Sequence, residues 1–230
     1  MPNLSLRLST IADFVKNKAA VCDVGTDHGY LAIHLIKNEV ASRVLATDIN
    51  EKPLLNARKN IEKSGVNGIE LRLCDGLSGV KKGEADTFII AGMGGEVIAG
   101  ILCRGADITR QRDITIILQP TTSPEFLRRF LCENGYKITE EKAVFENGKI
   151  YSVMLVKFTG EITAHTEDYF YIGELKPSDE TSLKYIEKQL LRCSKCVESL
   201  ENIPQKRDEF LHYKAAACSI EEILKNYGEN

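Results

Sequence analysis

The sequence predicts an α/β protein with an open, mostly parallel sheet of seven strands and a helical hairpin at its C-terminal end. Three observations support this fold class. Short apolar runs alternate with longer amphipathic stretches up to about residue 135, as in strands separated by helices. Two strand-like segments joined by Asn147-Gly148 follow. Residues 180–226 then carry apolar side chains spaced alternately by three and four, which is typical of packed helices.

The five apolar runs are short and contain few polar residues, as expected for strands covered on both faces. They cover residues 19–24, 42–48, 68–74, 85–91 and 113–119. The stretches between them predict helices at 30–38, 50–65, 95–105 and 123–135. Asn50 is suited to cap the second helix and Pro53 tolerates only an early position, whereas Gly65 and Gly135 stand where helices stop. Strands that alternate with helices predict a parallel sheet with helices on both faces.

Residues 135–158 form two alternating segments around Glu146-Asn147-Gly148-Lys149. An Asn-Gly pair between such segments is a strong signal for a tight hairpin turn. Five parallel strands followed by an antiparallel last strand is the order of the Rossmann-like, seven-stranded sheet of class I methyltransferases, which use S-adenosyl-L-methionine (SAM). A dinucleotide-binding domain continues with a parallel sixth strand instead. The hairpin therefore favours methyl transfer over hydride transfer before any side chain is considered.

Residues 180–226 predict two antiparallel helices packed as a coiled-coil hairpin, because Pro204 interrupts the apolar pattern near its middle. We therefore expect a methyltransferase domain at 1–160 and a helical appendage at 161–230. Lysines and arginines on the exposed faces of the appendage would contact a polyanion. The alternative is that they only keep the hairpin soluble.

The composition indicates a globular chain with a full hydrophobic core. Of its 230 residues, 43% are hydrophobic and 27% are charged, and the net charge of −3 does not by itself favour nucleic acid. Five arginines could nevertheless form a basic face, the alternative being an ordinary solvated surface. They are Arg104, Arg110, Arg112, Arg128 and Arg129.

Cysteine usage and hydropathy point to the cytoplasm. The seven cysteines are scattered and odd in number, which predicts reduced thiols, and Cys193-x-x-Cys196 has no second pair to complete a metal site. The chain shows neither an apolar stretch long enough for a membrane span nor the charged-then-apolar order of a secretory signal. We expect a cytoplasmic protein without a metal and without membrane association.

The turn after the first strand, Gly25-Thr26-Asp27-His28-Gly29, is the strongest candidate for a ligand site. In an open parallel sheet the ligand lies at the carboxyl ends of the strands, where this turn approaches it. The turn is not G-x-G-x-x-G, and a carboxylate at Asp27 would repel a pyrophosphate. The sulfonium and α-ammonium groups of SAM suit the carboxylates of Asp23 and Asp27 better. The alternative is an ordinary strand-to-helix turn.

Further candidates end the next three strands. Asp48 is placed to bind both ribose hydroxyls, and Asp75, with Gly76 beside it, to accept from an adenine amino group. A glycine-rich loop at residues 92–95 would admit both the methyl donor and a flat acceptor base.

Six segments in this order resemble the bacterial tRNA adenine(22)-N1-methyltransferase family: LSLRL, CDVGTDHGYL, ATDIN, CDGL, AGMGGEVI and LQP. The resemblance covers nearly the whole chain, and the tail is similar to the helical C-terminal domain of that family. It implies an enzyme that transfers the SAM methyl group to N1 of an adenine in the D-arm region of tRNA. The product S-adenosyl-L-homocysteine and the partner tRNA follow from that activity.

The cofactor site predicted on these grounds combines residues at or just after the ends of the first four strands with one residue near the start of the chain. Its members are Arg7, Asp23, Gly25, Thr26, Asp48, Ile49, Asp75, Gly76, Gly92 and Met93. Arg7, in the amphipathic start of the chain, would close over SAM or hold a phosphate. The alternative is a surface arginine.

Methyl transfer to a neutral adenine N1 needs positioning more than a strong base. Because the product adenine is cationic, Asp27 is the candidate to stabilise the charge or accept an N6 proton, with His28 and Tyr30 orienting it or stacking on the base. Alternatively, His28 caps the first helix and Tyr30 is a core ring. The target base must leave its pair, since N1 lies on the Watson–Crick edge. The predicted substrate-binding residues are Gly94, Gly95, Gln119, for the base edge, and Pro120, for an apolar wall.

Three other functions compete with this one. An NAD(P)-dependent oxidoreductase would share Gly25 and Asp48, but it should show the G-x-G-x-x-G turn and a parallel sixth strand. A non-catalytic RNA-binding or scaffold protein could keep the fold and use the helical hairpin as a partner-binding device. A methyltransferase with another acceptor, such as an amine, a protein or ribosomal RNA, is the third. The sequence leaves the oligomeric state open and is compatible with a monomer.

Overall fold

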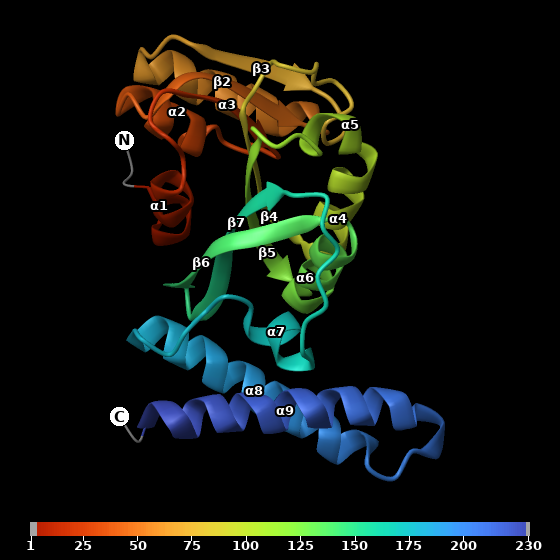
Figure 1. The fold of residues 1–230 in the computed structure, drawn as a ribbon. Helices are drawn as coiled ribbons and strands as arrows, with labels where there is room; N and C mark the ends of the chain where they lie inside the picture. The colour runs from red at the N-terminus through yellow and green to blue at the C-terminus, as the bar shows by residue number, and fades with distance from the viewer. Residues whose placement is uncertain (1–3, 229–230) are drawn as a thin grey trace.

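The computed structural model describes residues 4–228 and contains a seven-stranded sheet with helices on both faces (Figure 1). The strands lie in the order β3-β2-β1-β4-β5-β7-β6. Their bounds are Ala19–Val24 (β1), Ala41–Asp48 (β2), Ile69–Leu73 (β3), Thr87–Gly94 (β4), Thr115–Thr122 (β5), Tyr136–Glu146 (β6) and Lys149–Phe158 (β7). The helices between them are α1 (Leu6–Asp13), α2 (Tyr30–Lys37), α3 (Glu51–Ser64), α4 (Gly95–Arg104), α5 (Ala106–Thr109) and α6 (Pro124–Glu133).

Strands β1 to β5 pair in parallel, and β7 runs antiparallel to both β5 and β6. The turn between β6 and β7 places Asn147 at φ 50° and Gly148 at φ 75°, values that an Asn-Gly pair adopts at little cost. The predicted fold class is thereby confirmed. The strand order reverses between β1 and β4, and the carboxyl ends of these two strands flank the position where open α/β sheets bind ligands.

Successive residues of each central strand face different cores, which is why the strands read as continuous apolar runs. Val21 and Ile89 pack in the core beneath α1 and α2. Cys22 and Phe88, their chain neighbours, pack in the core beneath α4, α5 and α6. The two cores hold the sheet rigid, so that residues beyond the strand ends start from fixed positions.

The end of β4 differs from the prediction. The expected glycine-rich loop at 92–95 is instead the end of the strand and the first residue of α4, because Met93 pairs with Pro120 and Gly94 with Thr122. Gly92 takes up the register irregularity in the left-handed region, at φ 78°. Gly92 and Met93 are therefore positioned by the bend of a bulged strand. They do not lie in a flexible loop.

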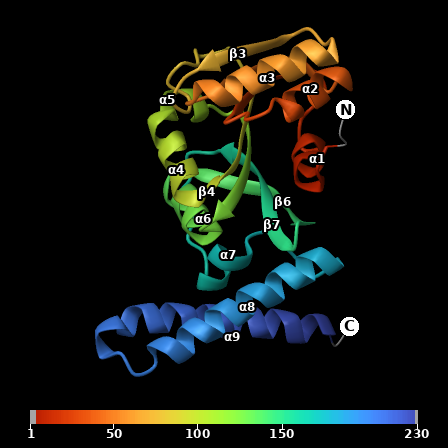
Figure 2. The ribbon, with the colours of Figure 1, turned by 180° about the vertical axis from the view of Figure 1, so that it is seen from behind.

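The C-terminal part consists of α7 (Glu167–Ile172), α8 (Glu180–Leu200) and α9 (Arg207–Gly228), with a short 3-10 helix at Pro204–Lys206. Helices α8 and α9 lie side by side and run in opposite directions, as Figures 1 and 2 show from two sides. Pro204 lies in the connection between α8 and α9, as predicted, and begins the 3-10 helix. Residues of the predicted apolar seam, including Ile186, Cys193 and Ile220, are buried in a third core between these helices.

Arg128 joins this third core to the sheet. Its guanidinium is completely buried and pairs with Glu141, also completely buried, at 2.6 Å. It donates further hydrogen bonds to the carbonyls of Phe170 and Tyr171, at 2.9 and 3.0 Å, and to the hydroxyl of Tyr185 at 3.1 Å. Arg128 therefore does not belong to the basic face that its sequence neighbours suggested, and it links α6 to β6, α7 and α8.

Candidate active site

A crevice with two lobes lies at the carboxyl ends of β1, β2, β3 and β4. The larger lobe has a volume of about 430 Å³ and is bordered by the ends of all four strands. The smaller lobe, of about 240 Å³, lies between α1 and the β1–α2 turn. Gly25, Asp27, Ala91 and Gly92 border both lobes. The two lobes are therefore parts of one continuous site, and the turn singled out in the sequence stands between them.

Gly25 suits its position by backbone conformation, and the flexible end of the Met93 side chain fills the space beside it. Its φ of +79° lies in the left-handed region, and an added Cβ would stand 2.3 Å from the Cε of Met93. Its N–H and that of Thr26 both donate to the carbonyl of Thr47, at 2.8 and 3.0 Å. The end of β2 thus fixes the turn, and Gly25 borders both lobes.

Asp23, the last polar residue of β1, carries a carboxylate that is buried without a cation. Its side chain is 5% exposed and accepts a 2.7 Å hydrogen bond from the hydroxyl of Thr26. Burial raises the pKa of Asp23 to about 6, and the nearby charge of Asp48 acts in the same direction. No lysine, arginine or histidine within residues 4–228 pairs with it. A carboxylate in this state is suited to receive a cationic group from a ligand in the smaller lobe.

The residues predicted to bind the ribose and the adenine of SAM all border the larger lobe. The Asp48 carboxylate is buried, and its Oδ1 accepts from the backbone N–H of Asn50 at 2.8 Å. Asn50 stands at the N-terminal end of α3 as predicted, but its side chain makes no capping hydrogen bond. Ile49, Asp75 and Gly76 border the same lobe.

Asp75 and Gly76 lie where β3 ends, on the side of the larger lobe that faces α4. The Asp75 carboxylate lies 3.4 Å from the Arg104 guanidinium, and both side chains are exposed. Gly76 has φ +56°, and a Cβ there would lie 3.2 Å from two side-chain carbons of Ile101. Ile101 also borders the lobe, so an apolar wall stands next to the polar strand ends.

Arg7 is anchored in the smaller lobe by a residue that the sequence analysis did not identify. Glu146, at the end of β6, accepts from the Arg7 backbone N–H at 3.0 Å and from its Nε at 3.1 Å. Arg7 Nη1 donates to Gln119 Oε1 at 2.6 Å. These contacts exclude the interpretation of Arg7 as an ordinary surface arginine. The only sequence signal at Glu146 was its place beside a hairpin turn, which says nothing about α1.

Gln119 holds neighbouring parts of the site together through hydrogen bonds. Its side chain is completely buried, its Oε1 also accepts from the Gly92 N–H at 3.1 Å, and its Nε2 donates to the Pro120 carbonyl at 2.8 Å. The structure therefore places the amide between Arg7 and the end of β4, where its hydrogen-bonding groups are already engaged. Neither Gln119 nor Pro120 borders the two lobes.

Gly94 and Gly95 also lie outside both lobes. A Cβ on Gly95 would stand 2.2 Å from the carbonyl oxygen of Ser123, and one on Gly94 would stand 3.0 Å from the hydroxyl of Thr122. Close packing of β4 and α4 against the end of β5 is therefore sufficient to explain these two glycines.

Asp27, His28 and Tyr30 meet at the rim of the smaller lobe. The Asp27 carboxylate is exposed and lies 3.5 Å from His28 Nε2, and the rings of His28 and Tyr30 stack with centroids 5.4 Å apart. Tyr30 is 41% exposed, so it is not a core ring. Gly29, and not His28, stands at the N-cap of α2. The two alternatives considered for these rings are thereby excluded.

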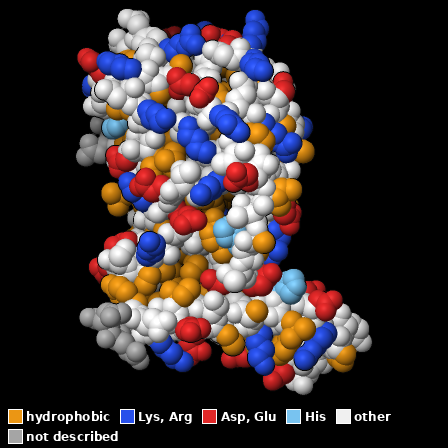
Figure 3. Space-filling model, in the orientation of Figure 1, with side chains coloured by type: hydrophobic (Ala, Val, Ile, Leu, Met, Phe, Trp, Pro, Cys, Tyr) orange, Lys and Arg blue, Asp and Glu red, His pale blue; other side chains and the backbone are white. Residues whose placement is uncertain are grey.

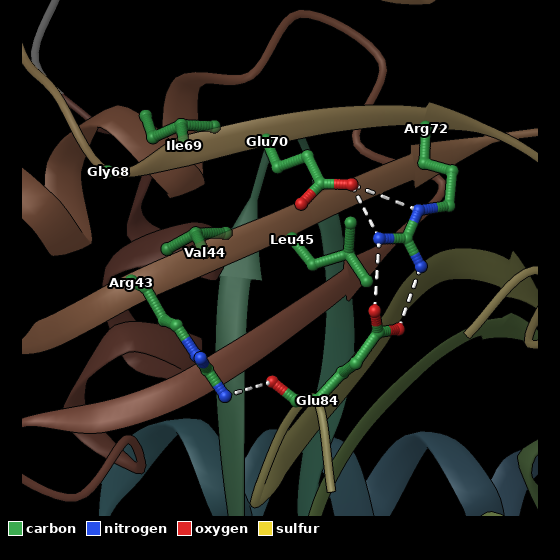
Figure 4. A pocket seen from close by; sticks show the side chains of 8 residues that line it. All are labelled: Arg43, Val44, Leu45, Gly68, Ile69, Glu70, Arg72 and Glu84. Carbon is green, nitrogen blue, oxygen red and sulfur yellow. Dashed lines mark hydrogen bonds and ion pairs between the residues drawn. The ribbon is translucent and has the colours of Figure 1, made fainter. Parts of the chain in front are cut away.

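A third hollow lies away from the strand ends, on the face of β2 and β3 (Figure 4). Residues 74–86, which connect β3 to β4, form no helix to cover this face. The charged groups there satisfy one another: Arg72 pairs with Glu84 at 2.7 Å and also with Glu70, and Arg43 donates to the Glu84 carbonyl at 2.9 Å. The carboxylates of this hollow are thus paired with Arg72, whereas Arg43 has only backbone carbonyls as hydrogen-bond partners within residues 4–228.

Residues 4–228 hold neither a metal-binding cluster nor a helix suited to cross a membrane. Residues 4–228 contain no group of three or more histidine, cysteine, aspartate or glutamate side chains arranged to hold a metal ion. None of the helices in that range is both long and apolar enough to span a membrane.

Comparison with known proteins identifies the family. A family model described as a methyltransferase domain matches residues 4–154. The tRNA (adenine(22)-N(1))-methyltransferase of Bacillus subtilis is 41% identical over 155 residues, which span 67% of this chain and 65% of that protein's length. The crystal structure of the B. subtilis M1A22 tRNA methyltransferase TrmK is 31% identical, with a TM-score of 0.85 over 97% of this chain and 99% of that chain.

The chain belongs to the tRNA (adenine(22)-N(1))-methyltransferase family. The resemblance that the sequence motifs indicated is thereby confirmed. A further structure of this kind, Streptococcus pneumoniae Sp1610 in complex with S-adenosyl-L-methionine, is 30% identical, with a TM-score of 0.79 over 93% of this chain and 99% of that chain. The fold of the family thus includes the C-terminal helices as well as the sheet.

Proposed function

We propose that this protein transfers the methyl group of SAM to N1 of an adenine in the D-arm region of tRNA. The observation that carries the proposal is the buried, cation-free carboxylate of Asp23 at the end of β1. It stands beside the turn at Gly25, whose φ of +79° favours glycine. Membership of the family and the SAM complex of the Sp1610 structure support the same ligand.

The residues present fit SAM by the chemistry of their donors and acceptors. Asp23 would bind the α-ammonium group, since a buried carboxylate gains most from a cation that enters with the ligand. Asp48 would accept from the ribose hydroxyls and Asp75 from the adenine amino group, both in the larger lobe. When bound, SAM supplies a methyl group on a sulfonium centre. No metal is required by this set of residues.

The acceptor side would be formed by the rim of the smaller lobe. Adenine N1 is neutral before the reaction and the product base is cationic, so a carboxylate at the rim stabilises the charge that develops. Asp27 holds this position, and the stacked His28 and Tyr30 provide flat faces for a base. Arg7, held by Glu146 and Gln119, closes the lobe from the side of α1.

We further propose that the appendage at 161–230 docks tRNA and that the protein acts in the cytoplasm, where unmodified tRNA is found. The buried contacts of Arg128 hold α7 and α8 in a fixed relation to the sheet. A rigid appendage can orient a large substrate toward the crevice, and a monomer suffices for this arrangement.

The decisive experiment is incubation of the protein with methyl-labelled SAM and unmodified tRNA, followed by nucleoside mass analysis. The expected product is 1-methyladenosine at a single position in the D-arm region. Label in a different nucleoside would indicate another acceptor. A protein that binds SAM and tRNA but incorporates no label would be a non-catalytic RNA-binding protein, and the proposal would be wrong.

A further inference from the structure

A groove of about 350 Å³ lies between the end of β5 and helix α8, and it shares no lining residue with the two lobes of the crevice. Residues 120–124 form one wall, residues 150–152 of β7 form the floor, and Tyr185, Lys188, Gln189 and Arg192 of α8 form the other wall. Figure 3 shows hydrophobic side chains gathered in the hollow above the C-terminal helices. The volume is within the range of small-ligand sites, roughly 300–1,000 Å³.

Two contacts connect the groove to the crevice. Tyr151 borders the groove, and the Arg7 guanidinium, which borders the smaller lobe, lies 5.9 Å from the centre of the Tyr151 ring. Pro120 borders the groove and pairs across the sheet with Met93, which borders the larger lobe. The groove is thus next to the crevice, and the Arg7–Gln119 pair stands between them.

Gln189 is the first sign that the groove is built for a ligand. This residue lines the groove and is 5% exposed, yet its Oε1 is buried without a hydrogen-bond partner among residues 4–228. An unsatisfied buried acceptor is costly, and natural proteins keep few of them. Because this oxygen is itself enclosed, the amide of Gln189 must turn for a donor bound in the groove, such as the amino or imino group of a nucleobase, to satisfy it.

Charge is the second sign. The Arg192 guanidinium forms two hydrogen bonds with Glu125, at 3.0 and 2.6 Å, so its charge is already neutralised. Lys188, on the same wall, is exposed and has no ion pair or hydrogen bond with any residue in the range 4–228. The opposite wall includes Thr121 and Thr122, both exposed. A lysine opposite threonines across a groove matches the phosphate and sugar of a nucleotide.

We propose that this groove binds the nucleotide that flanks the methylated adenine in the RNA. The inference rests on the proposed function. A base that is taken out of its helix pulls the adjoining backbone with it, and enzymes that act on such bases contact the flanking nucleotides. The target adenine must face the crevice, so its neighbour meets the next cavity along the surface. In that position Gln189 reads the base, Lys188 neutralises a phosphate, Tyr151 provides an aromatic floor and Pro120 an apolar wall.

The test measures the dissociation constant of labelled, unmodified tRNA directly, over a series of salt concentrations and without SAM. Lys188→Ala is expected to weaken tRNA binding about five- to tenfold and to lower the slope of log Kd against log salt by about 0.7 to 0.9. The matched control is Lys195→Ala, which removes the same charge from an exposed position of α8 outside the groove. It is expected to change the dissociation constant less than twofold.

Gln189→Leu keeps the volume of the side chain and removes its amide. We expect tRNA binding weakened about threefold to tenfold, with a melting temperature at least equal to that of the wild type because an unsatisfied buried oxygen is lost. SAM affinity should be unchanged in all three variants. If Gln189→Leu does not fold, the two lysine variants decide the matter alone.

Wild-type tRNA affinity in Lys188→Ala or in folded Gln189→Leu would overturn the proposal. An equal loss in Lys188→Ala and Lys195→Ala would also overturn it, since binding would then be a diffuse property of the helix. Failure of the proposed function has a different signature, namely a wild-type protein that forms no 1-methyladenosine. Because the binding measurement needs no methyl transfer, the two failures are separable.

Discussion

Arg7 and Gln119 are 112 positions apart in the chain, and Arg7 Nη1 donates a 2.6 Å hydrogen bond to Gln119 Oε1. The same oxygen accepts from the Gly92 N–H, and Glu146 accepts from the backbone and the side chain of Arg7. Helix α1 is thereby tied to the ends of β4, β5 and β6. The position of Arg7 in the smaller lobe depends on these ties, and its effect on SAM is testable through the residues that hold it.

Glu146→Ala is expected to release Arg7 and weaken SAM binding about tenfold by calorimetry. The loss of two hydrogen bonds to a carboxylate should also lower the free energy of unfolding by about 2 kcal/mol, or roughly 4–8 °C in melting temperature. The matched control is Glu140→Ala on the same strand, whose ion pair with Lys142 is half-exposed at both ends. It should change stability by less than about 0.5 kcal/mol. Equal effects of the two substitutions would contradict the role given to Glu146.

Asp23→Asn is expected to stabilise the ligand-free protein in a pH-dependent way. Burial raises the pKa of Asp23 from 3.8 to about 6, so the folded state favours the protonated acid. The stability contributed by this group is complete below about pH 4 and is lost as the pH rises through about 6. The variant should therefore gain up to about 3 kcal/mol over the wild type at pH 8 and little at pH 4, by chemical denaturation. The same difference at both pH values would refute the explanation.

The ionised form of Asp23 is the one that would bind an ammonium group, so SAM affinity should follow its titration. For the wild type, we expect affinity to rise between pH 5 and pH 7 and then level off, because the carboxylate ionises near pH 6. Asp23→Asn should bind SAM weakly at every pH and lose this rise. Calorimetric titrations across the range test the point, and a variant with the wild-type pH profile would show that another group binds the ammonium.

Asp27→Asn is the substitution that best isolates the carboxylate at the rim. Asp27 has a φ of +50°, a conformation that asparagine tolerates and alanine does not. We expect kcat for tRNA methylation to fall about 10- to 100-fold while the SAM dissociation constant changes less than threefold. His28→Ala, tested in parallel, measures the contribution of the neighbour. A wild-type rate in Asp27→Asn would remove Asp27 from the mechanism.

Arg128→Met should destabilise the whole chain by about 3–5 kcal/mol, because it leaves the Glu141 carboxylate buried without its partner. The double variant Arg128→Met/Glu141→Leu should recover much of that loss. Denaturation curves for the two variants and the wild type provide the measurement. If the single variant is as stable as the wild type, the ion pair does not hold α7 and α8 to the sheet.

Local patterns were sufficient for most of the fold. Apolar runs, helix-ending glycines and the Asn147-Gly148 turn act through neighbouring residues, so the seven strands and the helical hairpin could be predicted without tertiary information. The end of β4 was predicted wrongly as a loop. The pairing of Met93 with Pro120 extends the strand, and pairing across a sheet is not visible in one segment.

The same distinction holds for the site. The motif residues at the ends of β1, β2 and β3 come together in the crevice because parallel strands bring their carboxyl ends to one edge of the sheet. Arg128 looked like a surface arginine beside Arg129, and Glu146 looked like part of a turn. Their actual partners are distant in the chain, so no spacing in the sequence could reveal them.

By itself, the amino-acid sequence determined the class of sheet and the family. It also indicated the carboxyl ends of the parallel strands as the place for a ligand. All three conclusions depend on short motifs and on their order in the chain. Only the tertiary structure decided which polar groups are still free to bind a ligand. The side-chain oxygen of Gln119 already accepts from Arg7 and Gly92, whereas that of Gln189, a residue that lines the groove, has no partner among residues 4–228. The physical reason is that a hydrogen-bonding group can bind a ligand only if no neighbour in the folded protein already bonds to it. Those neighbours come from distant parts of the chain.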